Sequence, residues 1–94
     1  MIKMKNKYII MNIEDNCATS LDKIPQDKEL EIHKNLIKIK QEIPFGHKFA
    51  LKNINMGNQV IKYGEIIGIA IKDIKAGDWV HVHNIQSHYL EEIK

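Results

Sequence analysis

Two histidines lie one residue apart beside the only tryptophan of the chain, in the stretch GDWVHVHN at residues 77–84. In an extended strand, His81 and His83 project from one face, and the valines that alternate with them point to the other. Two imidazoles at this spacing can share a metal ion, although a catalytic zinc site normally has three protein ligands. The spacing therefore raises the question of a small metalloenzyme.

A third ligand for such a site would be His47, His88 or a carboxylate, and nothing in the sequence brings one of them near the pair. The simpler interpretation is a strand with Val80 and Val82 packed inward and two polar histidines on its outer face. We therefore predict no metal site within this chain, and no cofactor of its own.

Other hydrogen-bond donors stand next to glycines, where chains turn. His47 and Lys48 directly follow one glycine, and Lys62 and Tyr63 directly precede another. Imidazole, ammonium and phenol groups presented on turns can hold a carboxylate or a polyhydroxylated acid. The alternative is that these are half-buried strand ends and solvated lysines. The sequence has no Gly-rich phosphate loop, nucleophile elbow or His-Glu-x-x-His motif to indicate another chemistry.

Size and charge limit the classes of function. A chain of 94 residues forms one domain with a small core, so a partner subunit or a homo-oligomer is expected. The formal net charge is +2, and all 14 Lys and Arg positions are lysine, spread along the chain without a basic block. Bidentate recognition of phosphate or guanine relies on arginine, so the composition disfavours a nucleic-acid partner.

The single cysteine, Cys17, cannot form an internal disulfide or a cysteine-based zinc cluster, and no activating base stands beside it. The N-terminal apolar run has only about six residues, fewer than a signal peptide needs. No segment approaches the roughly 20 apolar residues of a membrane span. These features predict an inert thiol and a cytoplasmic protein without a membrane segment.

Apolar residues follow the period of β-strands rather than that of helices. Five segments are predicted to be short strands: 8–13, 36–43, 59–64, 65–71 and 79–85. Within the fourth of them, Gly68 indicates a bulge or a close backbone approach. Helical signals are limited to one turn at 18–24, after Asp15 and Asn16, and to the final stretch at 87–94.

A repeated frame, Ile-x-x-Gly-x-x-apolar, predicts tight turns between these strands. Its glycines are Gly46, Gly57 and Gly77, and IPQDKEL has the same frame with Asp27 in the glycine position. Glycine permits the positive φ of a sharp reversal, and the flanking apolar residues anchor both arms in a core. We predict an all-β fold, a compact clip of short strands with at least two of these glycines at positive φ and at most one or two short helical turns.

Four stretches, DNCATSL, IPFGHKFAL, VIKYGEIIGIA and IKAGDWVHVHN, together resemble the amino-terminal SAF-type β-clip domain of the altronate/galactarate dehydratase family. The small subunit of sulfolactate sulfo-lyase has a similar domain. The resemblance runs in order from about Asp15 to Asn84, with Cys17 where the family more often has an aliphatic residue. It implies one SAF-like β-clip domain over residues 1–94, with a core from about 7 to 85 and a tail at 86–94.

The resemblance also implies a reaction, in which a proton is removed α to a carboxylate and a β-substituent, water or sulfite, is lost. In that family a much larger region carries the main catalytic machinery and a divalent metal, usually iron. This sequence lacks that region, so the resemblance implies either a separately encoded small subunit or an excised domain. We expect a small subunit that is inactive alone and completes the substrate site of a separate large catalytic subunit. By resemblance, its substrate-binding residues are His47, Lys48, Lys62, Tyr63, His81, His83 and Asn84.

Three alternatives stay open at this point. One is the small subunit of a sulfolactate sulfo-lyase, and another is a stand-alone β-clip module that binds carbohydrates or carboxylates. A self-sufficient metallohydrolase is the least supported, because the chain offers no evident third ligand. The sequence does not identify which acid is the substrate.

Overall fold

The computed structural model describes residues 7–87, and its regular secondary structure is entirely β, which confirms the predicted all-β class. This part of the chain contains no helix of the length and hydrophobicity that a membrane crossing requires. The strands are β1 (Tyr8–Ile9), β2 (Cys17–Ser20), β3 (Glu29–Ile32), β4 (Asn35–Lys38), β5 (Lys48–Ala50), β6 (Gln59–Lys62), β7 (Glu65–Ala70), β8 (Trp79–Val80) and β9 (Ile85–Ser87).

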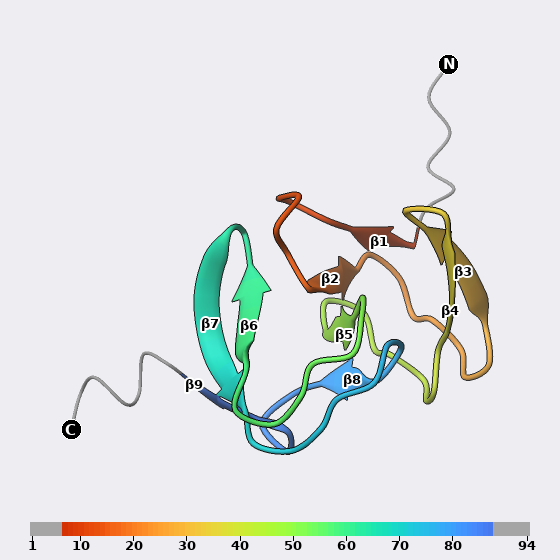
Figure 1. Cartoon of the computed structure of the whole chain (residues 1–94). Coiled ribbons are helices and arrows are strands. Elements are labelled where there is room, and N and C mark those ends of the chain that lie inside the picture. The colour runs from red at the N-terminus through yellow and green to blue at the C-terminus, as the bar shows by residue number, and fades with distance from the viewer. Residues whose placement is uncertain (1–6, 88–94) are drawn as a thin grey trace.

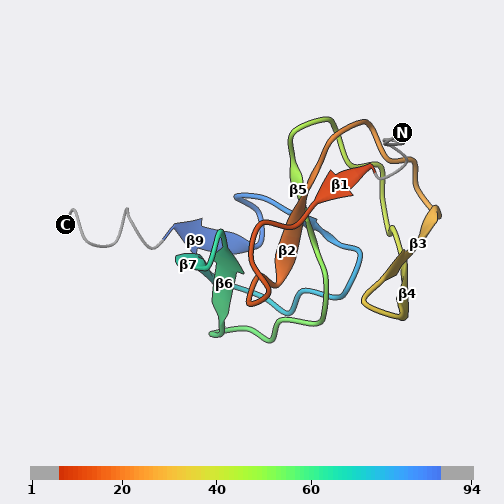
Figure 2. The same cartoon turned by 90° about the horizontal axis from the view of Figure 1, so that it is seen from above.

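Three antiparallel sheets form the body of the molecule. A central sheet has the order β1-β2-β5-β8, β3 and β4 form a separate hairpin, and β6, β7 and β9 form the third sheet. The β3–β4 hairpin lies on one side of the central strands and the β6–β7 hairpin on the other (Figures 1 and 2). The central strands are therefore covered from both sides.

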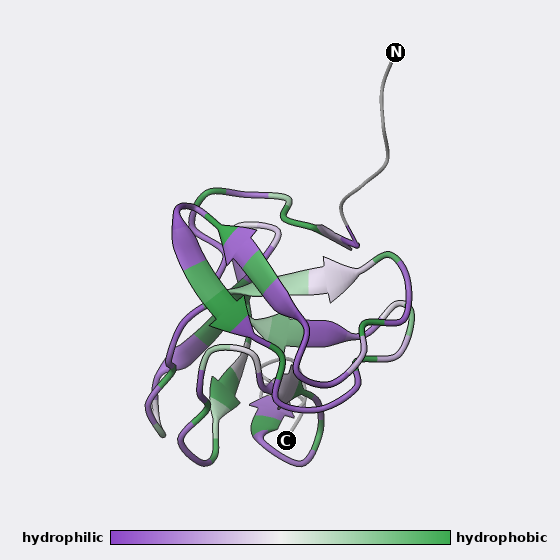
Figure 3. Ribbon diagram, turned by 90° about the vertical axis from the view of Figure 1, so that its right-hand side faces the viewer, coloured by the Kyte–Doolittle hydropathy of each residue, from purple (hydrophilic) through white to green (hydrophobic). Residues whose placement is uncertain are grey.

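Alternate residues of the central strands supply two separate cores, as the two-residue period of a strand requires. Cys17, Ala50 and Val80 pack with apolar residues from the β6–β7 half of the chain. Their neighbours Ala18 and Phe49 pack with isoleucines from the β3–β4 half. Figure 3 shows polar and apolar segments alternating along the ribbon, in keeping with strands that each divide one core from another or from solvent.

The four repeated turns pair two by two. Ile24 and Ile43 exchange backbone hydrogen bonds of 3.0 and 2.8 Å, and Ile54 and Ile74 exchange bonds of 2.7 and 2.8 Å. All four side chains are buried. The chain thus contains the same unit twice. In each unit, two turns of the repeated frame flank a hairpin and are joined to each other by backbone hydrogen bonds.

The turn residues have the predicted backbone conformation. Gly46, Gly57 and Gly77 have φ of +82°, +92° and +92°, and Asp27, in the equivalent position of the fourth frame, has φ of +72°. Aspartate tolerates this region better than most residues because its short side chain bonds locally. The interpretation of the repeat as a set of sharp turns is confirmed.

Two further predictions about the elements have clear outcomes. The bulge expected at Gly68 is present, because the pairing of β6 with β7 shifts register between Val60 and Ile61. The helical turn expected at 18–24 is wrong, because this segment begins inside β2 and pairs with β5. Cross-strand hydrogen bonds and burial outweigh the weak local capping signal there. The stretch expected to be helical at 87–94 lies outside the described residues, except that Ser87 ends β9.

Candidate functional site

The tip of the β6–β7 hairpin is held in place by a loop that precedes β2. Its turn residues, Tyr63 and Gly64, have φ of +60° and +73°. Asp15 accepts hydrogen bonds from the Gly64 amide at 2.8 Å and from the Asn12 amide at 3.1 Å. A β-carbon on Gly64 would lie 2.7 Å from Nδ2 of Asn12. The loop therefore fixes where the hairpin presents Tyr63.

A buried asparagine joins the same hairpin to the central sheet. Oδ1 of Asn16 accepts a hydrogen bond from the Ile61 amide at 2.7 Å, and its Nδ2 donates to the Gln59 carbonyl at 2.9 Å. The backbone of Asn16 adds a bond from its amide to the Ile61 carbonyl at 3.1 Å. Strand β6 is therefore bonded to the start of β2 through side chain and backbone alike.

Four polar side chains meet between β2, β5 and this hairpin, and we name them the lysine face: Thr19, Lys48, Lys62 and Tyr63. Thr19 and Lys48 are directly paired across β2 and β5, which places their side chains on one face. Lys62 is buried, and its Nζ lies 3.3 Å from the centre of the Tyr63 ring. Two ammonium groups, a phenol and a hydroxyl are thus gathered on one side of the central sheet.

The charges of the lysine face act on its titratable neighbours. The pKa of Tyr63 lies below its ordinary value, first because of the neighbouring Lys62 side chain, whose ammonium group lies over the Tyr63 ring, and then because of that ammonium's charge. Lys48 and the Thr19 hydroxyl lower it further. Burial raises the pKa of the Cys17 thiol to about 11, despite the opposing charges of Lys48 and Lys62. This supports the prediction that the thiol is inert.

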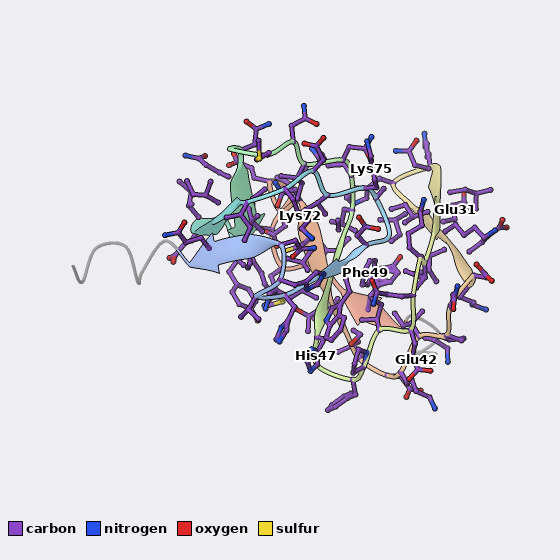
Figure 4. The ribbon with its side chains drawn as sticks, turned by 90° about the horizontal axis from the view of Figure 1, so that it is seen from below. Glu31, Glu42, His47, Phe49, Lys72 and Lys75 are labelled. Carbon is purple, nitrogen blue, oxygen red and sulfur yellow. The ribbon has the colours of Figure 1, made fainter. Side chains whose placement is uncertain are left out.

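A second group of side chains consists of aromatic rings at the start of β5 and around β8, and we name His47, Trp79, His81 and His83 the imidazole cluster. The Trp79 indole lies parallel to the His81 ring, within 9°, with ring centres 5.1 Å apart, and the His83 ring centre lies 5.7 Å from it. The His47 ring centre is 5.3 Å from that of His81. Figure 4 shows His47 at the periphery of the molecule, whereas Phe49, two residues later, lies in its interior.

The sequence predicted that His81 and His83 lie on one strand, and this prediction is wrong. Strand β8 ends at Val80, and His81–Asn84 form a turn in which the Asn84 amide donates to the His81 carbonyl at 3.0 Å. Val80 is buried as predicted, but Val82 is 75% exposed and not packed inward. The turn forms because Asn84 offers a local alternative to the strand ladder. Both imidazoles nevertheless contact Trp79.

The Asn84 side chain stabilises this turn through hydrogen bonds to the backbone. Its Oδ1 accepts from the His81 amide at 2.9 Å, and its Nδ2 donates to the Trp79 carbonyl at 2.8 Å. The side chain is buried, with 3% of its surface exposed. Its part in substrate binding stays a prediction, and the hydrogen bonds give it a separate role in holding His81 against Trp79.

The structure brings most of the predicted site residues together. The histidines at 47, 81 and 83 share one cluster, and Lys48, Lys62 and Tyr63 share the lysine face. Among residues 7–87, no group of three or more His, Cys, Asp or Glu side chains is arranged to hold a metal ion. His88, which the sequence offered as a third ligand, lies outside the described residues.

Protonation of the imidazole cluster is expected to weaken the fold. Trp79 Nε1 donates to Nδ1 of His47 at 3.3 Å, which requires the neutral imidazole with its proton on Nε2. The pKa of His81 lies below its ordinary value of 6.5, first because of desolvation and then because of the positive charges of His47, Lys48 and His83. A His with a lowered folded-state pKa stays neutral after the unfolded chain has taken up its proton. The free energy of unfolding should therefore fall as the pH drops below about 6.5.

Denaturant unfolding at a series of values between about pH 7.5 and about pH 5 measures this effect. The variant His81→Gln should lose less stability over this range than the wild type, because its side chain takes up no proton. His33→Gln is the matched control, since His33 is an exposed histidine in the other hairpin. Identical pH dependence in the wild type and in His81→Gln would contradict the interpretation.

The fold and these side chains define a class of protein: a small all-β domain with lysines and histidines around β5, β8 and the β6–β7 hairpin. Residues 6–88 match the altronate/galactarate dehydratase SAF domain. The chain belongs to this family.

Similar proteins include altronate dehydratases and sulfo-lyase subunits. The chain is 39% identical over 82 residues to altronate dehydratase of Escherichia coli strain K12, an alignment that covers 87% of the chain and 17% of that protein. It is 35% identical over 81 residues to altronate dehydratase of Bacillus subtilis strain 168, covering 86% and 16%. It is 48% identical over 48 residues to (2R)-sulfolactate sulfo-lyase subunit alpha of Paracoccus pantotrophus, covering 51% of the chain and 72% of that subunit. The chain thus spans about a sixth of the altronate dehydratases that it matches.

Sequence reasoning missed the residues that position the site. Asp15 and Asn16 were assigned to a helix cap, whereas they bind the β6–β7 hairpin, and Thr19 was not singled out. A signal was present, because all three lie in DNCATSL, one of the stretches that carried the family resemblance. Asp15 and Asn16 bind Gly64 and Ile61, which lie 49 and 45 positions away, and local patterns do not reveal such contacts.

Proposed function

We propose that this chain is the SAF-domain subunit of a lyase that acts on a sugar acid or a related hydroxy acid, and that it completes the substrate site of a separate large catalytic subunit. The family membership carries this proposal. Altronate dehydratases have one such domain in about a sixth of their length. The sulfo-lyase match has most of its length in this domain, and its name marks it as one subunit. The second example supports a separately encoded SAF subunit.

The site residues support the same role. The lysine face and the imidazole cluster lie on opposite sides of β5 and β8, because Lys48 pairs with Val80 whereas Trp79 pairs with Phe49, but the charge of Lys48 still acts on His81. Ammonium groups suit the carboxylate of a sugar acid, and neutral imidazoles suit its hydroxyl groups. The partner would carry the divalent metal that the family resemblance implies. The reduced thiol of Cys17 fits a cytoplasmic location, which we also propose.

A reconstitution assay tests the proposed function. The pure chain should show no turnover of altronate, galactarate or (2R)-sulfolactate with ferrous iron. The chain combined with the large catalytic subunit expressed from the same genome should convert one of them, and the product, water or sulfite, distinguishes a dehydratase from a sulfo-lyase. Turnover by the pure chain, or full activity of the large subunit without it, would refute the proposal.

The same assay tests the imidazole cluster. The double variant His81→Gln and His83→Gln should fold, because surface substitutions usually change stability by no more than about 0.5 kcal/mol. It should lower kcat/KM of the complex about tenfold or more, as expected for the loss of hydrogen bonds to a charged substrate. A stable variant with normal kcat/KM would show that the imidazole cluster is not part of the substrate site.

A further inference from the structure

Lys62 in the lysine face is largely buried as a residue and has no anionic partner among residues 7–87. Lys62 is 9% exposed, and a buried charge is costly unless it is paired. Among the residues that the structure describes, the ion pairs are Lys7 with Asp22 and Lys38 with Asp27. Neither pair involves the lysine face, so within residues 7–87 the Lys62 ammonium group has the Tyr63 ring beside it but no carboxylate.

The buried acid in this neighbourhood does not pair with Lys62. Asp15 is 4% exposed and lies close enough to raise the pKa of Cys17. Both of its oxygens, however, accept hydrogen bonds from backbone amides, those of Gly64 and Asn12. Its charge is used to hold the hairpin tip, and the ammonium group of Lys62 instead lies over the ring of Tyr63.

A second observation independently indicates a ligand. The hydroxyl oxygen of Thr19 is buried and has no hydrogen-bond partner within residues 7–87. Buried hydroxyl groups are rarely left unpaired, because the lost hydrogen bonds cost about 1–3 kcal/mol. Thr19 is paired directly with Lys48 across the sheet, and its hydroxyl lies close enough to the Tyr63 phenol to lower the pKa of Tyr63, although no hydrogen bond of ordinary geometry joins the two groups. The orphan hydroxyl is therefore part of the same face.

The backbone of Tyr63 shows that this residue is kept at the hairpin tip in spite of strain. Its φ of +60° is unfavourable for a residue other than glycine, asparagine or aspartate, and costs on the order of 1–3 kcal/mol. Two-residue hairpin turns with this conformation favour Asn-Gly or Asp-Gly. The turn of the β3–β4 hairpin has the same conformation at His33 and Lys34, with φ of +52° and +70°, so both hairpin tips of the chain are strained.

We propose that the lysine face binds one oxyanion group, the carboxylate or sulfonate of a hydroxy acid, and that the chain binds it without a partner. The face offers hydrogen-bond donors from four side chains and two positive charges, which fits an anionic acceptor. The ammonium groups of Lys48 and Lys62 neutralise the ligand, and the hydroxyls of Thr19 and Tyr63 donate hydrogen bonds to it. Naming a hydroxy acid rests on the proposed function, whereas the oxyanion chemistry rests on the face alone.

A titration of the pure chain tests this inference. Galactarate, (2R)-sulfolactate and galactitol, the uncharged polyol with the carbon skeleton of galactarate, are added at constant ionic strength while amide chemical shifts are followed by NMR. We expect binding of an acid with a dissociation constant of about 1 mM, and shifts at Thr19, Lys48 and Tyr63. Galactitol should cause none. The acid that binds more tightly shows which of these two hydroxy acids the face prefers.

Variants separate a built site from a general attraction of anions to lysine. Lys62→Met, which keeps the length of the buried stem, should weaken binding about tenfold or more, and Thr19→Val about threefold or more. Lys72→Met is the matched control, because Lys72 is an exposed lysine that is not part of the lysine face. Equal binding of galactitol and galactarate, or equal effects of Lys62→Met and Lys72→Met, would overturn the inference. If Lys62→Met does not fold, Lys48→Met decides the question by the same comparison.

The outcome of this binding titration can be separated from the outcome of the reconstitution assay. Weak or absent binding of both acids by the pure chain, together with an active complex, would refute the oxyanion site and leave the proposed function intact. Specific binding by the lysine face without any lyase activity of the complex would support the site and refute the proposed function.

Discussion

Replacing Gly77 with valine should unfold most of the chain, whereas the same change at Gly57 should be tolerated. Both glycines have φ of +92°, so a β-branched side chain is strained by a similar amount at either position, on the order of 1–3 kcal/mol. At Gly57 an added β-carbon meets nothing within 4 Å. At Gly77 it would lie 2.0 Å from the carbonyl oxygen of Lys38 on β4. The backbone must therefore move only when the substitution is at Gly77.

The expected cost at Gly77 is more than about 4 kcal/mol, a large part of the roughly 5–15 kcal/mol that stabilises an ordinary domain. Circular dichroism melts and urea unfolding of Gly77→Val and Gly57→Val measure the difference directly. Because φ is the same at both positions, the difference isolates the steric contact between the turn and β4. Equal melting temperatures for the two variants would show that the Gly77 turn does not pack against Lys38 as described.

Removing the side chain of Asn16 should release the β6–β7 hairpin from the central sheet. In Asn16→Ala the Ile61 amide and the Gln59 carbonyl both lose their partner. An unpaired buried polar group costs about 1–3 kcal/mol, so the two together should lower the free energy of unfolding by about 2 kcal/mol or more. The amide of Ile61 should also lose its protection from hydrogen exchange.

The same variant tests whether positioning of the hairpin matters for ligand binding. Lys62 and Tyr63 follow Ile61 directly, so a displaced β6 moves half of the lysine face. Asn16→Ala should therefore weaken binding of galactarate even at temperatures where the chain stays folded. Asn55→Ala is the control, because Asn55 is an exposed asparagine and should change stability by no more than about 0.5 kcal/mol. Similar unfolding curves and affinities for both variants would contradict the role of Asn16.

Local features of this protein were predictable from its sequence. The positive φ of Gly46, Gly57 and Gly77 and the turn at Asp27 each follow from what one residue permits in its own backbone, and the bulge lies next to Gly68, at Ile67. The burial of Ile37 and Ile39 between exposed lysines follows from the two-residue period of a strand. Together these features determined the all-β class, and the motifs around them determined the family.

Only the tertiary structure decided which turn pairs with which and what the site contains. The pairing of Ile24 with Ile43, and of Ile54 with Ile74, depends on register and burial across the whole chain. The turn at His81–Asn84 replaced the predicted strand because the Asn84 side chain bonds the backbone of His81 and Trp79. The lysine face joins β2, β5 and the β6–β7 hairpin, three segments far apart in sequence. Backbone preferences and strand periods act between neighbouring residues, whereas these contacts form only when distant segments bury a common core.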